Sequence, residues 1–577
     1  MSDEKMVEVP RERFAPWLIE PMRRSRSIYM KVAMAAVLIN IFALLTSIFT
    51  MVVYDKVLPN NATSSLIALS IGLAIVVIFD FALKTLRAYF VDVAGARIDR
   101  EIGASVFKQL LAIRLDQKKG STGALAGVVR ELETLRDFFA SATLTAIVDV
   151  PFILLTLAVI AIIGGPVVFV PLAMIPIVIL IGYLTEPAMA RLSARMMGEG
   201  LLKQTVLVET IGGLETIKTA GAAPIMTDRW HSALEQHADT GLRQRLVANL
   251  GITMAGSAQT ISYAGVVIIG VGLIANQSLT MGGLIACSIL AGRAVAPLGQ
   301  IAGLLSRVNA TRTAYRQLDA LMSTPPEGPE GEPLVLSRAE GRIEFRNVHF
   351  RYPGAPEKTL EGVSFTIQPG EHVALLGRVG SGKSTIAKLL LGLYEPEEGV
   401  ILLDGTDIRQ LDPIDLRRKI TSSMQESLLI SGSVRENIVL GRAGIGDEEM
   451  VRAAELSGTH QFIGQIANGY DRKLADRGEG LSGGQRQSIA IARALAGSPH
   501  VLIFDEPSSA MDTQTESGLL DRLDKELVGR TFLVITHRTP FLRLVTRVLI
   551  IDRGKVVADG PRDKVLAALN RPKVAAI

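Results

Sequence analysis

The first half of the chain contains a series of long apolar runs separated by polar segments. A helix that crosses a bilayer needs about 20 predominantly apolar residues, and six runs reach or nearly reach this length. They predict an all-α transmembrane domain with six helices. The six runs are Val32–Val53, Ser64–Leu83, Leu144–Ile163, Pro166–Tyr183, Ala255–Ala275 and Met281–Leu305.

The connections between these runs indicate how the domain lies in the membrane. Two long connections, about Lys84–Thr143 and Thr185–Met254, are rich in Lys and Arg, whereas the other three are short and nearly free of them. An excess of Lys and Arg marks the cytoplasmic side. We therefore expect both long connections and both termini to be cytoplasmic.

The long connections have a helical pattern of their own. In Val128–Phe139, apolar residues recur at Val129, Leu132 and Leu135, near the period of an α-helix. Such helices either are solvated stalks or contact a domain below the membrane, and the rest of the chain favours contact.

The second half of the chain has the pattern of a soluble α/β domain. Residues 322–341 are dense in Pro, Gly and acidic residues, as in a linker. Strand-like runs then alternate with helical stretches, which predicts a mostly parallel sheet with flanking helices. Those runs include Val373–Leu376, Val501–Phe504, Thr531–Ile535 and Val548–Ile551. The predicted plan is a cytoplasmic N-terminal segment (1–30), a transmembrane domain (31–321), a linker (322–341) and this α/β domain (342–577).

The sequence Gly-Arg-Val-Gly-Ser-Gly-Lys-Ser-Thr lies between the strand Val373–Leu376 and a predicted helix, Ile386–Leu393, and it predicts that the domain 342–577 is a P-loop nucleotide-binding domain. Glycines let backbone N–H groups surround phosphates, Lys383 supplies a cation for them, and the Ser384 hydroxyl can bind Mg²⁺. The strand and helix disfavour a Gly-rich turn without function. The predicted ligands are ATP and Mg²⁺. The candidate binding residues are Gly377, Arg378, Val379, Gly380, Ser381, Gly382, Lys383, Ser384 and Thr385.

Polar residues that follow two other predicted strands complete the candidate site. Asp505 and Glu506 follow the apolar run Val501–Phe504, and His537 closes the run that begins at Thr531. Asp505 suits the Mg²⁺ shell and Glu506 is placed to polarise an attacking water. A lone His is more often structural, but the position of His537 favours contact with the γ-phosphate. We predict Glu506 and His537 as catalytic residues.

The segment Leu-Ser-Gly-Gly-Gln-Arg-Gln at 481–487 resembles the signature of ATP-binding-cassette (ABC) proteins. The resemblance implies that Tyr352 stacks on adenine, that Gln425 contacts Mg²⁺, and that Ser508–Asp512 is the D-loop. It also implies that His537 is the switch histidine. The signature residues implied to bind nucleotide are Ser482, Gly483, Gly484 and Gln485, and the implied metal ligands are Ser384, Gln425 and Asp505.

In this family the signature of one subunit caps the γ-phosphate bound to the other, so the resemblance implies a homodimer; a heterodimer with a related half is the alternative. Six spans ahead of a cassette resemble the exporter class, in which ATP binding and hydrolysis switch a cavity between the two sides of the membrane. The resemblance places cytoplasmic coupling helices near Gly120–Gly127 and Glu209–Ala220.

Three segments of the membrane domain, Val53–Asn60, Val129–Phe138 and Ala291–Pro297, resemble their counterparts in type I secretion transporters. This implies an unfolded polypeptide substrate, such as a repeat-in-toxin protein, protease or adhesin. It also implies a bacterial inner membrane, a periplasmic adaptor and an outer-membrane channel. An exporter of lipids, drugs or small peptides is the alternative with the same architecture. A membrane ATPase that regulates without transporting is disfavoured by Glu506 and His537.

Several features narrow the possibilities further. The 30 residues before the first span hold no Cys or His, so we expect no peptidase activity from this chain. A net charge of +4 over 577 residues gives no argument for nucleic-acid binding. Cys287, the only cysteine, lies in an apolar run and is expected to be a packing residue. Asp80 and Asp149 lie near cytoplasmic ends of spans, where either could line a substrate path or reach water.

Overall fold

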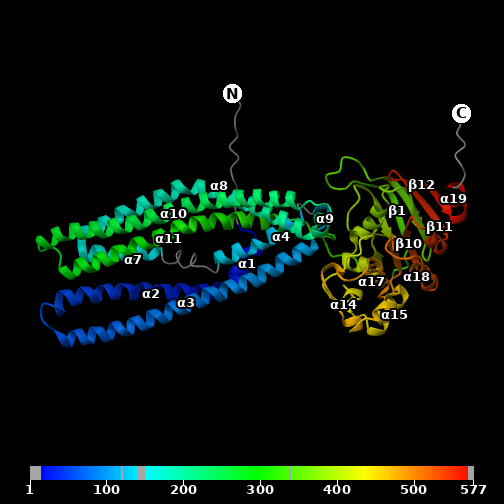
Figure 1. The fold of residues 1–577 in the computed structure, drawn as a ribbon. Helices are drawn as coiled ribbons and strands as arrows, with labels where there is room; N and C mark the ends of the chain where they lie inside the picture. The colour runs from blue at the N-terminus through cyan, green and yellow to red at the C-terminus, as the bar shows by residue number, and fades with distance from the viewer. Residues whose placement is uncertain are drawn as a thin grey trace, which may run out of the picture. The chain divides into compact units, whose positions relative to one another are not determined.

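The computed structural model describes residues 14–117, 121–139, 150–329, 331–336, 339–442 and 444–569, and the side chains of 297–307 are outside this description. The chain divides into two compact units. Residues 1–112 and 119–324 form a helical unit, and residues 113–118 and 325–577 form the second unit (Figure 1).

The helical unit consists of long helices that pack lengthwise. Figure 1 shows α2 and α3 side by side, and α8, α10 and α11 together as a second group. The bounds are α1 Pro16–Arg24, α2 Arg26–Val52, η1 Val53–Val57, α3 Thr63–Ala112, α4 Thr122–Arg130, α5 Leu132–Phe139, α7 Pro151–Gly164, η3 Gly165–Val168, α8 Phe169–Gly212, α9 Leu214–Thr219, α10 Ala223–Ala275 and α11 Met281–Met322.

Helices α2, α3, α7, α8, α10 and α11 correspond to the six predicted spans. Within the described ranges, four helical segments are long and apolar enough to cross a membrane, and one of them, residues 151–212, holds both α7 and α8. A shorter apolar stretch, Met281–Ala296, begins α11. Residues 144–149 of the third predicted span and Asp149 lie outside the described residues.

Burial in this unit is the reverse of that in a soluble bundle. Large apolar side chains face outward, with Ile162 83% exposed and Ile268 74% exposed. The buried faces hold small residues such as Gly270, Ala258 and Ala294, which allow helices to approach closely. This arrangement is suited to a lipid environment. Cys287 is buried and free, as expected.

One local expectation needs correction. The helical pattern across Val128–Phe139 is interrupted by a turn at Glu131, so that α4 and α5 are separate helices. The coupling helices near 120–127 and 209–220 stay a prediction, and α4 begins at Thr122, inside the first of these ranges. Helix α9 lies within the other range, Glu209–Ala220.

The second unit contains two sheets. A four-stranded antiparallel sheet has the order β2-β1-β4-β5, and a six-stranded sheet has the order β12-β11-β3-β10-β9-β6. In the larger sheet only β12 runs antiparallel to its neighbour. The strands are β1 Ile343–Phe350, β2 Leu360–Ile367, β3 His372–Leu376, β4 Glu398–Leu403, β5 Thr406–Asp407, β6 Ile420–Ser423, β7 Gly432–Ser433, β8 Lys473–Leu474, β9 Val501–Asp505, β10 Thr531–Ile535, β11 Arg547–Asp552 and β12 Lys555–Pro561.

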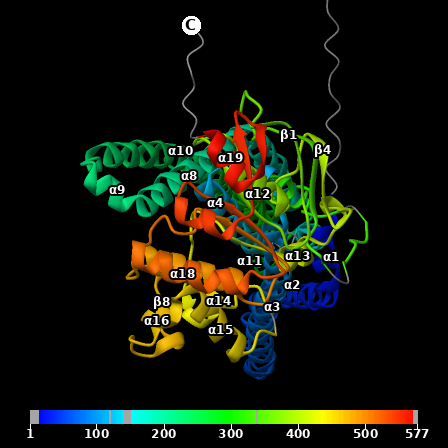
Figure 2. The same cartoon turned by 90° about the vertical axis from the view of Figure 1, so that its right-hand side faces the viewer.

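Helices cover both faces of the larger sheet. Figure 2 shows α14, α15 and α16 gathered near α18, away from β1 and β4. The helices are α12 Lys383–Leu390, η4 Ile408–Gln410, α13 Pro413–Lys419, α14 Val434–Ile438, α15 Asp447–Ser457, α16 Thr459–Ile463, η5 Gly469–Asp471, η6 Asp476–Gly478, α17 Gly483–Leu495, α18 Thr513–Glu526, η7 Thr539–Leu544 and α19 Arg562–Leu569.

Alternate residues of the central strands enter two different cores. Val501 and Ile503 of β9 pack with α12 and the antiparallel sheet. Leu502 and Phe504 of the same strand pack with α17 and α18. This period of two is what a strand buried on both faces requires. It places α12 and α17 on opposite faces of one sheet.

Described residues of the Pro- and Gly-rich segment after residue 324 are part of the second unit and bond to it. The Leu334 N–H donates to the carbonyl of Gln410 at 2.8 Å, and the carbonyl of Leu334 accepts from Asp412 N–H. Glu327 pairs with Arg417 at 2.7 Å. The segment is therefore held by hydrogen bonds and an ion pair, although its composition is typical of a free linker.

Candidate functional site

The predicted phosphate-binding loop lies between β3 and α12, whose first residue is Lys383 and not the predicted Ile386. The backbone of Gly377 (φ 153°) passes so close to β11 that a Cβ there would lie 2.0 Å from the carbonyl oxygen of Ile551. At Gly382 (φ 102°) a Cβ would lie 2.6 Å from the Leu360 side chain. Glycine is therefore required at both positions.

The Lys383 side chain folds back onto the backbone of the loop. Its ammonium donates to the carbonyls of Gly377 at 2.9 Å and Arg378 at 2.8 Å. Burial lowers the pKa of Lys383, while Glu506 and Asp505 raise it. The Ser381 hydroxyl is buried and has no hydrogen-bond partner in the described part of the chain, and Val379 is 91% exposed at the tip of the loop. A buried cation and a free hydroxyl in one loop suit an anionic ligand.

Asp505 ends β9 and is almost fully buried, at 1% exposure. Its Oδ1 atom has no hydrogen-bond partner among the described residues, and its carboxylate is hydrogen bonded by the Ser384 hydroxyl. Burial raises the pKa of Asp505 despite the nearby cation Lys383. A buried carboxylate oxygen without a partner, beside a hydroxyl, is a donor set that fits Mg²⁺.

Glu506 and His537 meet at the end of two neighbouring strands. The His537 Nε2 atom lies 3.6 Å from Glu506 Oε1. Glu506 has φ +50°, an uncommon conformation for this residue type, and its N–H donates to the carbonyl of Ile535 at 2.9 Å. Burial raises the pKa of Glu506. A carboxylate whose pKa is raised in this way can accept a proton from a water molecule.

The two remaining residues of the predicted pocket differ in how they are held. Tyr352 forms a hydrogen bond with the Thr385 hydroxyl at 3.1 Å and packs edge-on against Tyr394 at 5.3 Å. The Lys388 ammonium lies 5.6 Å from the centre of its ring. Gln425 is exposed and makes no hydrogen bond to the described residues, and its contact with Mg²⁺ stays a prediction.

The signature segment begins α17. Ser482 is the N-cap residue and forms a capping box with Gln485, so the Ser482 hydroxyl and the first amides of the helix lie at an exposed helix start. Gly483 and Gly484 lie against Ala510 of the D-loop, and a Cβ on Gly484 would lie 3.0 Å from the Ala510 carbonyl oxygen. A helix start of this kind can bind an anion.

Gln487 belongs to the signature segment, but the sequence predicts no role for this residue. It is 3% exposed, and its Nε2 donates to the carbonyl of Glu506 at 2.8 Å and to the Ser509 hydroxyl at 3.2 Å. Its Oε1 accepts from the Ala510 N–H at 3.1 Å. Gln487 therefore joins the signature helix, the D-loop and the candidate catalytic glutamate.

A second residue outside the predicted set holds the other side of the D-loop. Glu516 in α18 is 4% exposed, accepts a hydrogen bond from the Ser508 hydroxyl, and lies 3.5 Å from Arg538 Nη1. Glu516 follows the N-cap Asp512, and an acidic residue in the first turn is common in helices. The sequence signal was therefore too general to find it.

A phosphate-binding loop, a following Asp-Glu pair and a signature helix on one α/β unit, joined to a helical membrane unit, define an ABC transporter. The family description of the ABC transporter transmembrane region matches residues 29–297, and that of the ABC transporter matches residues 360–509. The toxin RTX-I translocation ATP-binding protein of Actinobacillus pleuropneumoniae is 34% identical over 556 residues, covering 96% of this chain and 78% of that protein.

The leukotoxin translocation ATP-binding protein LktB of Mannheimia glucosida is 35% identical over 559 residues, again covering 96% and 78%. The chain therefore belongs to the ABC exporters of type I secretion, and it is a membrane protein with an ATPase domain. The structure of a bacterial Atm1-family ABC exporter with ATP bound matches with a TM-score of 0.84 at 24% identity, covering 96% of this chain and 97% of that one. At that identity the match shows the exporter fold.

Proposed function

We propose that this chain is the inner-membrane ATPase and permease of a type I secretion system and moves an unfolded polypeptide out of the cytoplasm. The observation that carries the proposal is the extent of the similarity to toxin translocators, which spans 96% of the chain and so includes the membrane helices as well as the cassette. A shared cassette alone would support ATP hydrolysis and say nothing of the cargo. The proposal includes a periplasmic adaptor, an outer-membrane channel and cytoplasmic termini.

In the proposed reaction the cassette binds ATP at the loop Gly377–Thr385, with Tyr352 against the adenine. Ser384, Asp505 and Gln425 would hold Mg²⁺, which would neutralise phosphate charge. Glu506 accepts a proton from the attacking water, and its burial supports this role because the pKa is raised toward neutrality. His537, 3.6 Å from Glu506, orients the carboxylate and contacts the γ-phosphate.

The proposed functional unit is a homodimer with two shared ATP sites. Its support is the placement of α12 and α17 on opposite faces of the sheet. The start of α17 carries Ser482, while the start of α12 carries Lys383, so one chain supplies the two halves of a nucleotide site on different faces. A partner chain facing this one would bring each Ser482 to the other chain's loop.

The experiment that tests the cargo uses Glu506→Gln, which should trap ATP in the complete dimer. The variant, expressed in its own host and held with ATP and Mg²⁺, is purified gently, and mass spectrometry identifies what is retained. Glu426→Gln, which changes an exposed residue, is the matched control. We expect an adaptor protein or a large secreted polypeptide on Glu506→Gln only. Enriched lipid or small molecules with no adaptor would overturn the polypeptide assignment and favour a lipid or drug exporter.

A further inference from the structure

A cavity in the helical unit takes no part in the ATP site. It has a volume of about 390 Å³ and lies among α4, α5, α8, α10 and α11. On α8 it is lined from Ser193 to Gln204, which is beyond the apolar run that ends near Tyr183. It therefore belongs to the part of the unit that extends past the membrane-spanning segments. Its volume falls in the range of small-molecule sites.

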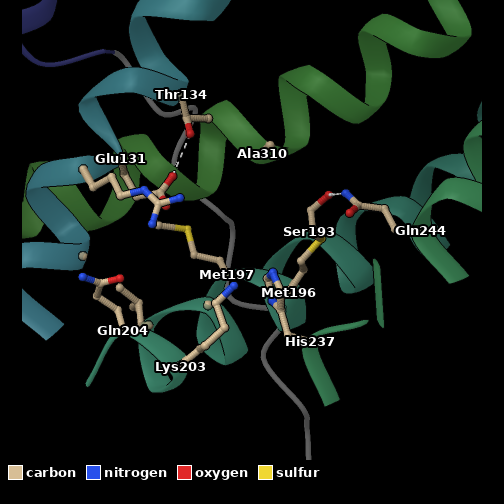
Figure 3. Close-up of a pocket in the computed structure, with 14 residues that line it drawn as sticks. Glu131, Thr134, Ser193, Met196, Met197, Lys203, Gln204, His237, Gln244 and Ala310 are labelled. Atoms are coloured by element: carbon tan, nitrogen blue, oxygen red, sulfur yellow. Dashed lines mark hydrogen bonds between the residues drawn. The ribbon is translucent and has the colours of Figure 1, made fainter. Parts of the chain in front are cut away.

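The described lining of this cavity carries more positive than negative charge. Arg130 and Lys203 line it, and neither forms an ion pair or a hydrogen bond with any described residue. Figure 3 shows the Lys203 side chain directed toward the region between Gln204 and His237. Two cations against one carboxylate, Glu131, leave the described lining with a net positive charge, which attracts an anion.

A third group is also without a partner. The His237 ring is hydrogen bonded to the backbone of Met196, whereas its Nδ1 atom is buried and has no partner among the described residues. Burial lowers the pKa of His237, and the charges of Lys203 and Arg130 lower it further, against the opposing effect of Glu199. The ring thus experiences the positive field of the cavity.

The acidic and neutral polar groups of the cavity do not cancel this field. Glu131, the one carboxylate among the lining residues described, accepts a hydrogen bond from the Thr134 hydroxyl at 2.8 Å. Gln244 donates to the Ser193 hydroxyl at 3.0 Å. Figure 3 shows both pairs as dashed contacts. A hydrogen bond from a hydroxyl leaves the charge of Glu131 in place, so the described lining holds two cations against one carboxylate.

The remaining wall is apolar and adaptable. Met196 and Met197 both line the cavity, and thioether side chains fit ligands of varied shape. We propose that this cavity binds a small organic anion, with its carboxylate or phosphate group between Arg130, Lys203 and His237 and its body against Met196 and Met197. The anion comes either from the cytosol or from the headgroup of an anionic phospholipid. The proposal is independent of which cargo the transporter moves.

The first measurement uses the full-length dimer in phosphatidylcholine nanodiscs and radiolabelled inorganic phosphate as the probe. The cassettes are saturated with AMP-PNP and Mg²⁺, so that the phosphate loop cannot bind the probe. We expect saturable binding that the double variant Arg130→Gln/Lys203→Gln weakens at least about tenfold, since charge-assisted hydrogen bonds are lost. Arg191→Gln, which removes an exposed cation on the same helix α8, is the control and should bind normally.

The second measurement distinguishes the lipid source. Native mass spectrometry of the dimer taken directly from its own membrane should show an anionic phospholipid on the wild type and on Arg191→Gln that the double variant lacks. Weaker phosphate binding by the double variant supports the site and a cytosolic anion. Loss of the phospholipid from the double variant supports the site and a lipid headgroup. Equal occupancy of wild type and double variant in both measurements overturns it. If the double variant fails to fold, as judged by its thermal unfolding, His237→Gln takes its place with the same expectations.

Discussion

The side chain of Gln487 donates a hydrogen bond to the main-chain carbonyl of Glu506 at 2.8 Å, which joins the signature helix to the residue proposed as general base. Because the same amide also holds Ser509 and Ala510, Gln487 fixes the backbone on both sides of the turn that carries Glu506. The φ of +50° at Glu506 is maintained by this set of contacts.

Gln487→Ala should therefore lower ATP turnover by about tenfold or more while leaving ATP affinity nearly unchanged. The loss leaves a buried carbonyl and a buried amide without partners, at about 1–3 kcal/mol each, and frees Glu506 to move. Steady-state hydrolysis and nucleotide binding by the full-length protein measure the two effects separately. Gln514→Ala, an exposed residue on α18, is the control. Normal turnover by Gln487→Ala would remove this residue from the positioning role.

The phosphate loop offers a matched pair of glycines. Gly377→Ala should abolish most ATP binding, because its Cβ would lie 2.0 Å from the Ile551 carbonyl oxygen and the loop must shift. Gly380→Ala, also at positive φ but with open space around it, should pay only backbone strain of about 1–2 kcal/mol. Titration with a fluorescent ATP analogue compares them. Equal affinities would mean that the clash does not determine the shape of the loop.

Much of the fold was predictable because its signals are local. The strand Thr531–Ile535 was predicted with the bounds observed for β10, since a strand buried on both faces is a short apolar run. The phosphate loop could be predicted because its glycines and Lys383 are neighbours in the sequence and form one continuous motif. Residues such as Gln487 and Glu516 escaped because a buried amide or carboxylate acts through partners elsewhere in the chain. Strand β2 was also not predicted, since its mixed pattern is settled by its pairing with β1.

The dimer proposal predicts complementation between two defective chains. Lys383→Ala removes a phosphate loop and Ser482→Arg blocks a signature, so each homodimer should fail to occlude ATP. A mixed dimer, purified through two different tags, should occlude about one ATP, because one loop still faces an intact signature. Retained ATP after gel filtration with Mg²⁺ measures this. No occlusion in the mixed dimer, with each chain still folded, would mean that loop and signature of the same chain form the site.

Asp505 gives a prediction about pH and stability. Burial raises its pKa in the folded protein, so the folded state binds this proton more tightly than the unfolded state does. Stability from this group therefore rises as pH falls through the raised pKa, and the charged form costs stability at neutral pH. Asp505→Asn should raise the melting temperature of the nucleotide-free protein by a few degrees at pH 7.5.

This advantage should shrink as the pH is lowered, because the wild-type carboxylate then takes up its proton. Asp524→Asn, an exposed position on α18, should show no such trend. Differential scanning calorimetry at several pH values tests both variants. A constant difference between wild type and Asp505→Asn across the pH range would show that charge burial at Asp505 is not the cause.

Asp55 links the C-terminal end of α2 to the N-terminal end of α11. It belongs to the segment Val53–Asn60, which resembles its counterpart in type I secretion transporters. Asp55 accepts hydrogen bonds from the Thr280 hydroxyl at 2.6 Å and from the Gly282 N–H at 2.8 Å. Asp55 thus accepts from the Gly282 amide, which has no partner within α11 because it lies in the first turn. The two residues are 227 positions apart in the sequence. Asp55→Ala leaves that amide unpaired.

Asp55→Ala should cost about 1–3 kcal/mol, seen as a lower melting temperature of the full-length protein and as weaker stimulation of ATPase by cargo. The affinity for ATP should be unchanged, since the cassette is a separate compact unit. Asn60→Ala, whose side chain bonds only to the Lys56 carbonyl one turn away, is the control. If Asp55→Ala and Asn60→Ala melt alike, the link between α2 and α11 contributes nothing. If Asp55→Ala lowers ATP affinity, its effect is not confined to the membrane unit.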